Sequence, residues 1–140
     1  MRHLATLLAS TPMAVLCACT DVGDPVLASS ELSIPSGPLS YDGDIRPILL
    51  DNGCLGCHQA GGNGGLDVTD LASLHRGGNS GRPAIVPCDH GASYLWYRIR
   101  WCEMPMPGYP HCVDPLDVAI VAAWIDQGGG ATYDPSVCPD

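Results

Sequence analysis

The chain has 140 residues, which is the length of a single domain, and its formal net charge is −9. Its six basic residues are all arginines, so the chain lacks the strongly basic face that nucleic-acid phosphates require. This acidity favours protein partners with a basic docking face, although it could equally serve only to keep the protein soluble.

Residues 1–18 have the pattern of a bacterial lipoprotein signal peptide. Arg2 is followed by an apolar stretch, Leu4 to Leu16, that is too short to span a bilayer. The sequence Leu-Cys-Ala-Cys at 16–19 resembles a lipobox, in which Cys19 would be acylated and become the mature N-terminus. Ordinary cleavage without a lipid is the alternative. We therefore expect export to the periplasmic side of a membrane, with a lipid anchor there.

Residues 19–40 are rich in Ser, Pro and Gly, which is typical of a flexible tether. The folded domain is expected over residues 41–130, and its first helix should end at Asn52. Asp42 or Asp44 can cap this helix, and Pro47 is tolerated in a first turn. The expected apolar stripe comprises Ile45, Ile48 and Leu49.

The sequence Cys-Leu-Gly-Cys-His at 54–58 is the attachment motif of a c-type haem. Cys54 and Cys57 can form thioethers with the two haem vinyl groups, because positions three apart share one face of a helical turn. His58 would then be the proximal iron ligand. Cys-x-x-Cys alone also occurs in zinc sites, disulfides and redox dithiols. However, the chain has no second Cys or His pair at zinc-knuckle spacing.

Residues 59–65 form a glycine-rich loop without the Lys-Ser/Thr ending of a phosphate-binding loop. We expect its backbone to approach a haem edge closely. A short helix should follow, beginning at Asp67 or Thr69 and ending near His75.

Two further helices are expected. The first covers 93–100, with Leu95 and Ile99 facing inward. The second begins after Asp114 with a proline at its first position, and Gly128 ends it. Asp117 would complete an arrangement close to a capping box. The expected buried stripe of this helix comprises Leu116, Ile120, Val121, Trp124 and Ile125.

Several short words occur in an order known from one family: Asp44-Ile-Arg-Pro-Ile-Leu, Cys54-x-x-Cys57-His58, Gly65-Leu66-Asp67, Ala84-Ile-Val-Pro87, Ser93-x-Leu95, Met104-Pro105 and Trp124-Ile-Asp-Gln-Gly128. The chain resembles the planctomycete-type branch of the small mono-haem cytochromes c over about residues 41–130. This resemblance implies an all-α small cytochrome c fold, in which the terminal helices cross beside one covalently bound haem c. It also implies His58 as the proximal ligand and a methionine as the distal ligand.

The distal ligand has more than one candidate. Met104 holds the family position, but this chain reads Met-Pro-Met-Pro where the family usually has Met-Pro-Pro, so Met106 is the alternative. His90 and His111 are rival ligands. Arg98 is a candidate contact for a haem propionate, or a solvated helix residue.

Four cysteines remain, and they allow three disulfide pairings. We favour Cys102–Cys112, because this bridge would close the loop that presents the methionine. The other bridge would then be Cys88–Cys138, which would tie down the C-terminal tail at 131–140.

The predicted function is a periplasmic electron-transfer protein with His/Met-ligated haem, which acts on redox partner proteins and has no small-molecule substrate. No catalytic pair stands out in the sequence, and six-coordinate iron has no open position, so we do not expect an enzyme. The alternative is a haem-based enzyme or sensor, a small peroxidase or gas binder, with an open or weakly ligated distal site. A third hypothesis is a surface lipoprotein without haem, stapled by disulfides or zinc.

Overall fold

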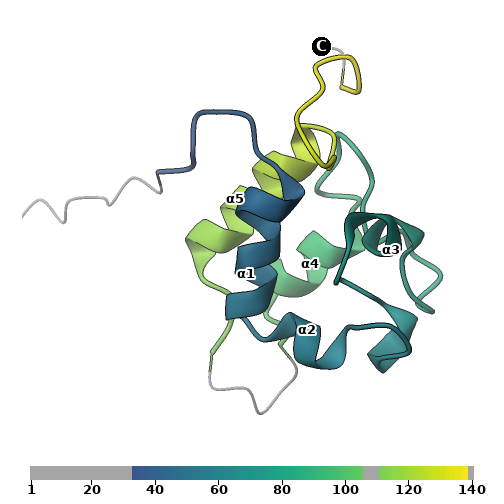
Figure 1. Ribbon diagram of the computed structural model, residues 1–140. Coiled ribbons are helices and arrows are strands. Elements are labelled where there is room, and N and C mark those ends of the chain that lie inside the picture. Colours follow the sequence, from purple (N-terminus) through teal and green to yellow (C-terminus); the bar gives the residue numbers. More distant parts are fainter. Residues whose placement is uncertain (1–32, 106–110, 139–140) are drawn as a thin grey trace, which may run out of the picture. The chain divides into compact units, whose positions relative to one another are not determined.

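The computed structural model describes residues 33–105 and 111–138, and Figure 1 shows their arrangement. No strand occurs in these two ranges, which confirms the prediction of an all-α class. None of the helices there is long and apolar enough to cross a membrane. The helices are α1 (Arg46–Asp51), α2 (Cys54–Cys57), α3 (Leu71–Arg76), α4 (Tyr94–Arg100) and α5 (Pro115–Asp126), with a π-helical turn at Tyr41–Ile45 and a 3₁₀ turn at Asn63–Gly65.

The first helical segment begins after Ser40, earlier than predicted. The Ser40 hydroxyl accepts a hydrogen bond from the Gly43 backbone N–H at 3.2 Å, and the Asp44 carboxylate accepts one from the Ser40 backbone N–H at 2.7 Å. The prediction that Asp42 or Asp44 is the cap was therefore wrong, because Asp44 supports the cap from inside the first turn. The π-helical turn directly precedes α1, which carries Pro47 in its first turn. A wider turn suits this position, because proline lacks an N–H and crowds the preceding turn.

The chain already packs on the folded domain before the π-helical turn, at Leu39. This side chain is 2 % exposed, and its backbone N–H donates to Oε1 of Gln127 at 2.8 Å. Leu39 and Ser40 are thus packed on the domain, although their composition groups them with the tether.

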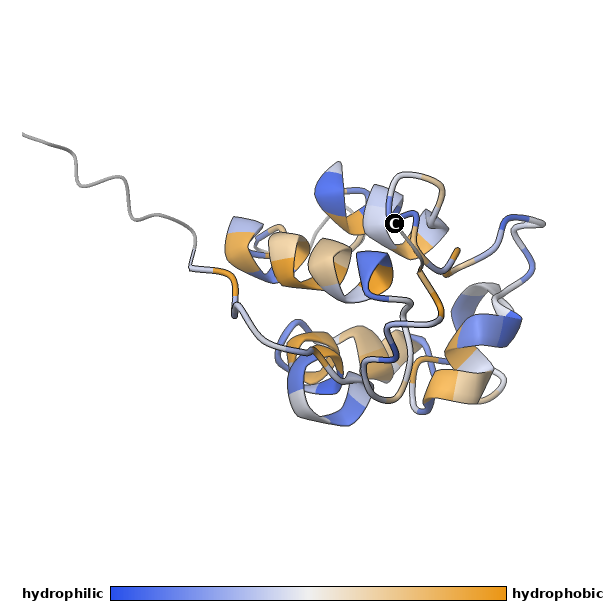
Figure 2. Cartoon of the chain, turned by 90° about the horizontal axis from the view of Figure 1, so that it is seen from above, coloured by the Kyte–Doolittle hydropathy of each residue, from blue (hydrophilic) through white to orange (hydrophobic). Residues whose placement is uncertain are grey.

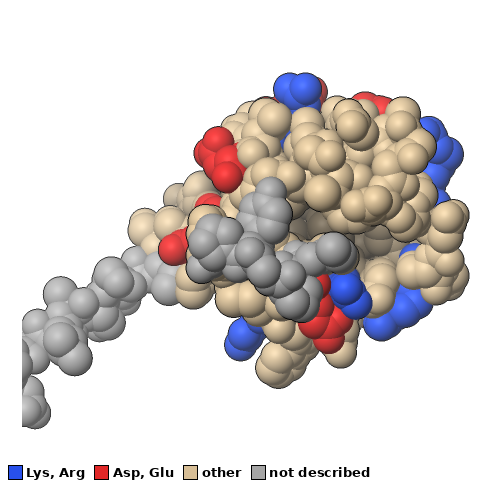
Figure 3. All heavy atoms as spheres, turned by 90° about the horizontal axis from the view of Figure 1, so that it is seen from below, with Lys and Arg blue, Asp and Glu red and all other residues tan. Residues whose placement is uncertain are grey.

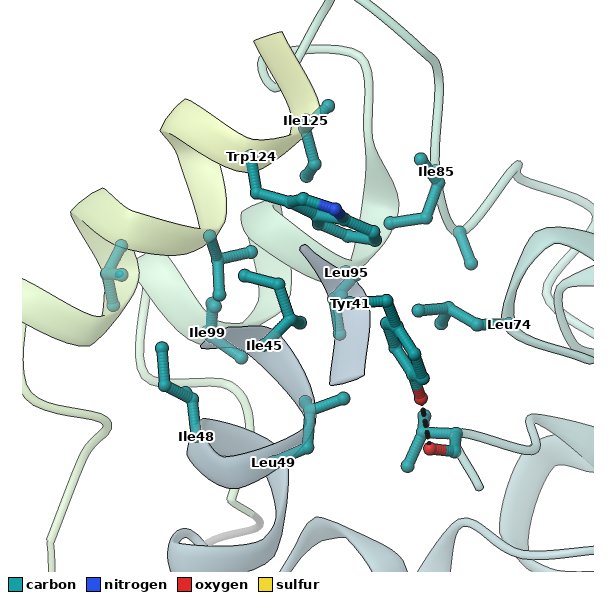
Figure 4. Close-up of a cluster of buried hydrophobic side chains, with 14 of the residues drawn as sticks. Tyr41, Ile45, Ile48, Leu49, Leu74, Ile85, Leu95, Ile99, Trp124 and Ile125 are labelled. Carbon is teal, nitrogen blue, oxygen red and sulfur yellow. Dashed lines mark hydrogen bonds between the residues drawn. The ribbon is translucent and has the colours of Figure 1, made fainter. Parts of the chain in front are cut away.

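The core lies between residues 41–51, α4 and α5 (Figure 4). The ring centroids of Tyr41 and Trp124 are 5.9 Å apart, and Nε1 of Trp124 donates to the Gly130 carbonyl at 2.9 Å. The Tyr41 hydroxyl donates to the Val68 carbonyl at 2.6 Å, and burial raises the pKa of Tyr41 to about 12. The polar ends of both aromatic residues are therefore satisfied inside the core.

Residues 41–51 and α5 lie side by side and antiparallel (Figure 1). Tyr41 contacts Trp124 near the C-terminal end of α5, whereas Asn52 donates to Asp117 near its N-terminal end at 3.3 Å. Asp117 therefore joins the two segments, and only Asp114 caps α5, by accepting from the Leu116 backbone N–H at 2.8 Å.

The buried face of α5 differs in part from the predicted stripe. Leu116 and Ile120 are only half-buried, and Val118 is buried in their place. Figure 2 shows α5 coloured apolar or neutral along most of its length, so hydropathy alone does not select one face. Val121, Trp124 and Ile125 are buried as predicted.

The cap of α3 is Asp70, so the prediction of Asp67 or Thr69 was wrong. Asp70 accepts from the Ser73 backbone N–H at 2.9 Å. Asp67 instead accepts from both the backbone N–H and the hydroxyl of Thr69, at 2.9 and 2.6 Å. These bonds form a separate turn just before the helix.

Two disulfides tie the loops to this frame, in the favoured pairing. Cys88–Cys138 has a Cα–Cα distance of 5.5 Å and holds the C-terminal tail. Cys102–Cys112 has a Cα–Cα distance of 5.2 Å and connects the end of α4 to the segment before α5. Both therefore brace regions that lack regular structure.

Candidate functional site

The Cys-x-x-Cys-His motif begins with a sharp turn at Gly53. The helix α1 ends at Asp51, Asn52 is its C-cap, and Gly53 has a φ of +69°, a left-handed conformation that glycine adopts without strain. Cys54 and Cys57 then open and close the single turn of α2, and neither forms a disulfide. Burial raises the pKa of the half-buried Cys54 thiol, whereas Cys57 is exposed. Both thiols thus remain available for one covalent partner.

His58 is held through one ring nitrogen. Its Nδ1 lies 3.1 Å from the carbonyl oxygen of Asn63, and a carbonyl can only accept, so Nδ1 carries the proton in this contact. The other nitrogen, Nε2, then has its lone pair free for a metal. The His58 carbonyl accepts from the Val68 backbone N–H at 2.9 Å, which fixes the backbone as well. This is the support that a metal-ligating histidine usually has.

The glycine-rich loop packs against the chain itself. The Gly62 N–H donates to the Gln59 carbonyl at 2.7 Å, which closes the loop behind the motif. A Cβ on Gly78 would lie 2.6 Å from the Gly64 carbonyl oxygen, so two glycine loops meet backbone to backbone. This close packing explains glycine at 62 and 78, while approach to a haem edge stays a prediction for Gly64, which lines the cavity described next.

A cavity of about 380 Å³ lies beside the motif, and Cys54, His58 and Met104 all line it. This volume falls in the range of about 300–1,000 Å³ that is usual for ligand pockets. Figure 3 views the molecule from the side of α2 and shows a hollow near the middle of this face. Most of the wall is apolar, formed by Leu49, Leu66, Val68, Ala84, Leu95 and Ile99.

Met104 lies just beyond the C-terminal end of α4. Its side chain is partly buried against the core, and its backbone N–H donates to the Arg98 carbonyl at 3.1 Å. The Cys102–Cys112 disulfide lies close by in the sequence and ties the start of this segment to the stretch before α5. Met106, the alternative ligand, lies outside the described residues.

The two rival histidines do not line the cavity. His90 forms a contact through Nδ1 with Asp126 at 2.8 Å, and its ring packs edge-on against Trp96 at 4.6 Å. His111 is exposed. Among the candidates in the described residues, Met104 is therefore the one that the cavity wall contains.

Two arginines are the charged residues of the cavity lining, as far as the structure describes it. The Arg98 guanidinium pairs with Glu103 at 2.8 Å. The Arg82 guanidinium lies 4.4 Å from the ring centroid of Tyr94 and 5.2 Å from that of Tyr97. The sequence prediction missed Arg82, because it lies in a Gly-Arg-Pro turn whose spacing indicates no site.

These residues fit a covalently held haem. Two free thiols lie on one helical turn and a supported histidine directly follows it, a soft thioether lies on the cavity wall, and apolar side chains complete the lining. They indicate a small helical domain whose cavity suits a c-type haem.

The family comparison gives the same answer. Residues 54–108 match the family model described as Planctomycete cytochrome C, and the matched segment includes Cys54, Cys57, His58 and Met104. This match supports a planctomycete-type cytochrome c domain that includes residues 54–108. No curated protein and no solved structure matches the chain.

Proposed function

We propose that this protein is an electron carrier with one covalently bound haem c, ligated by His58 and Met104. The observation that carries this proposal is that Cys54, His58 and Met104 line the same apolar cavity. Haem c supplies reversible one-electron exchange between ferrous and ferric iron. Cytochrome c domains generally transfer electrons to protein partners and do not transform a substrate.

Each ligating residue has a defined task in this proposal. Cys54 and Cys57 would form the two thioethers, and His58 would bind iron through Nε2 while Nδ1 donates to Asn63. The thioether of Met104 is a soft ligand that favours ferrous iron and so raises the reduction potential. The apolar wall keeps water away from the metal and stabilises the less charged, ferrous form.

The haem propionates need cationic partners at the cavity edge. We favour Arg82 for this role, because the described residues include no carboxylate in an ion pair with it. Arg98, the candidate from the sequence, lines the cavity as well but is already paired with Glu103. Its contact with a propionate is therefore the second choice.

The proposed location is the periplasmic side of a bacterial membrane, reached through the signal peptide at 1–18. Lipidated Cys19 would hold the protein there, and residues 19–40 would act as the tether. Two disulfides support an oxidising compartment, because such bonds are rare in the cytosol. With a net charge of −9, the protein should dock redox partners that present a basic face.

The direct test is expression in a host with c-haem maturation, followed by mass spectrometry and a redox titration. We expect one covalent haem, lost in the Cys54→Ser/Cys57→Ser variant, and reversible one-electron reduction. A colourless protein under these conditions would refute the proposal. Rapid binding of CO or cyanide to the native protein would instead indicate the haem-based enzyme or sensor with an open distal site.

A further inference from the structure

The chain that presents Met104 folds back onto the end of α4. The Arg98 carbonyl accepts two hydrogen bonds, from the Glu103 backbone N–H at 2.9 Å and from the Met104 backbone N–H at 3.1 Å. One carbonyl thus fixes the backbone of the methionine and of the residue before it. The side chain of Met104 leaves this point to line the cavity.

The Arg98 side chain also contacts the segment Glu103–Met104, through Glu103. Its Nη1 lies 2.8 Å from Oε2 of Glu103, and its Nη2 donates to the Glu103 carbonyl at 3.4 Å. Nη1 also donates to the hydroxyl of Tyr94, one turn earlier on α4, at 3.3 Å. The guanidinium therefore bridges α4 and the residue that precedes Met104.

This bridge is partly shielded from water. The side chain of Arg98 is 30 % exposed and that of Glu103 is 39 % exposed, so solvent weakens the ion pair but does not abolish it. The planar guanidinium can donate in several directions at once, which a lysine ammonium on a flexible stem does less well. An arginine at position 98 therefore differs from a lysine in the directions of its hydrogen bonds and not in its charge.

We propose that Arg98 and Glu103 are positioning residues for Met104, and that their ion pair keeps this methionine on the iron against competing ligands. The inference rests on the proposed function, because it takes Met104 as the distal ligand. It gives Arg98 a task other than the propionate contact that the sequence indicates. It also predicts that a weaker ion pair makes Met104 easier to replace on the iron while the fold stays intact.

The test is a titration of the ferric holoprotein with imidazole, a small ligand that competes with methionine for iron. Methionine-ligated ferric haem has a weak sulfur-to-iron band in the near infrared. Loss of this band measures how much of the methionine the imidazole has displaced. Breaking a partly exposed ion pair costs about 0.2–1 kcal/mol, so Glu103→Gln should tighten imidazole binding by about 1.4- to fivefold. Arg98→Leu removes the bonds to Tyr94 and the Glu103 carbonyl as well, and its effect should be larger. The imidazole affinity of Arg98→Lys should lie between those of the wild type and Arg98→Leu.

Arg100→Leu is the matched control. Arg100 belongs to the same helix, lies over the exposed Trp101 ring at 5.3 Å and does not line the cavity, so its loss should leave imidazole binding unchanged. Glu103→Gln nearly preserves shape, which keeps the test valid if Arg98→Leu folds poorly. Wild-type imidazole affinity in Glu103→Gln would overturn the inference. Absence of the near-infrared band in wild-type protein would instead overturn methionine ligation, and with it the proposed function.

Discussion

His58 shows how a backbone contact can prepare a metal ligand. Its Nδ1 faces the Asn63 carbonyl at 3.1 Å, so the ring presents Nε2 without a proton. Under the proposed function, this contact would orient the ring so that Nε2 faces the iron. The same histidine without this carbonyl could turn and could change its tautomer.

The two methionines of the Met-Pro-Met-Pro sequence can be separated by substitution. Met104→Ala should abolish the near-infrared sulfur-to-iron band of the ferric protein and lower the reduction potential by on the order of 0.1 V, because it removes the soft ligand. Met106→Ala is the matched control and should keep both the band and the potential. The reverse result would assign the distal position to Met106.

Arg82 should raise the reduction potential through its charge. Positive charge at the cavity edge disfavours ferric iron, so Arg82→Leu should lower the potential, by a small amount because Arg82 is exposed and solvent screens its charge. Tyr94 and Tyr97 hold the guanidinium in place, so Arg82→Lys should recover only part of the effect.

Redox titration of the Arg82→Leu variant measures this shift, with Arg100→Leu as the control of equal charge change. An equal shift in both variants would mean that Arg82 acts only through net charge. An unchanged reduction potential in Arg82→Leu would mean that the Arg82 charge does not act on the haem.

The helices were easier to predict from the sequence than their first residues. Apolar spacing located the buried Ile45, Ile48 and Leu49, as well as Leu95 and Ile99 of α4. The caps at Ser40 and Asp70 were missed, because several Ser, Thr and Asp residues precede each helix and local sequence does not choose among them.

Both disulfides should stabilise the fold, but only one of them should affect the binding of Met104 to the iron. By the chain-entropy model, Cys102→Ser/Cys112→Ser should cost about 2.5–3 kcal/mol of unfolding free energy, and Cys88→Ser/Cys138→Ser should cost about 4 kcal/mol because its loop is longer. Only the first pair flanks Met104, so only its loss should also weaken the near-infrared band and lower the potential.

Denaturant unfolding of the two holoproteins, together with their ferric spectra, tests this difference. An unchanged band and potential in Cys102→Ser/Cys112→Ser would contradict a role for that disulfide in ligation. A weakened band in Cys88→Ser/Cys138→Ser would mean that general loosening of the fold explains both effects.

The site as a whole was only partly predictable. The Cys-x-x-Cys-His motif predicted Cys54, Cys57 and His58, since covalent chemistry fixes their spacing, and the cavity lining includes Cys54 and His58. Arg82 and Asn63 were missed, because their roles depend on how two glycine-containing loops return to the cavity and not on any local pattern. Arg98 was found, but its pairing with Glu103 was not.

The lipid anchor can be tested on the full chain in a bacterial host. Cys19→Ser should remove the acyl mass from the mature protein and release it from the membrane fraction, because lipid chains supply the anchoring. The haem spectrum should stay the same, since residues 33–40, the described part of the tether, do not line the cavity. Membrane association that survives Cys19→Ser would refute lipidation at this residue as the anchor.

The near-infrared spectrum of the oxidised wild-type protein tests whether the cavity holds a haem ligated by His58 and Met104. If His58 and Met104 ligate the iron, the oxidised protein has a weak sulfur-to-iron band and the reduced protein has a sharp α band. A ferric spectrum with haem present but without the sulfur-to-iron band would contradict this ligation.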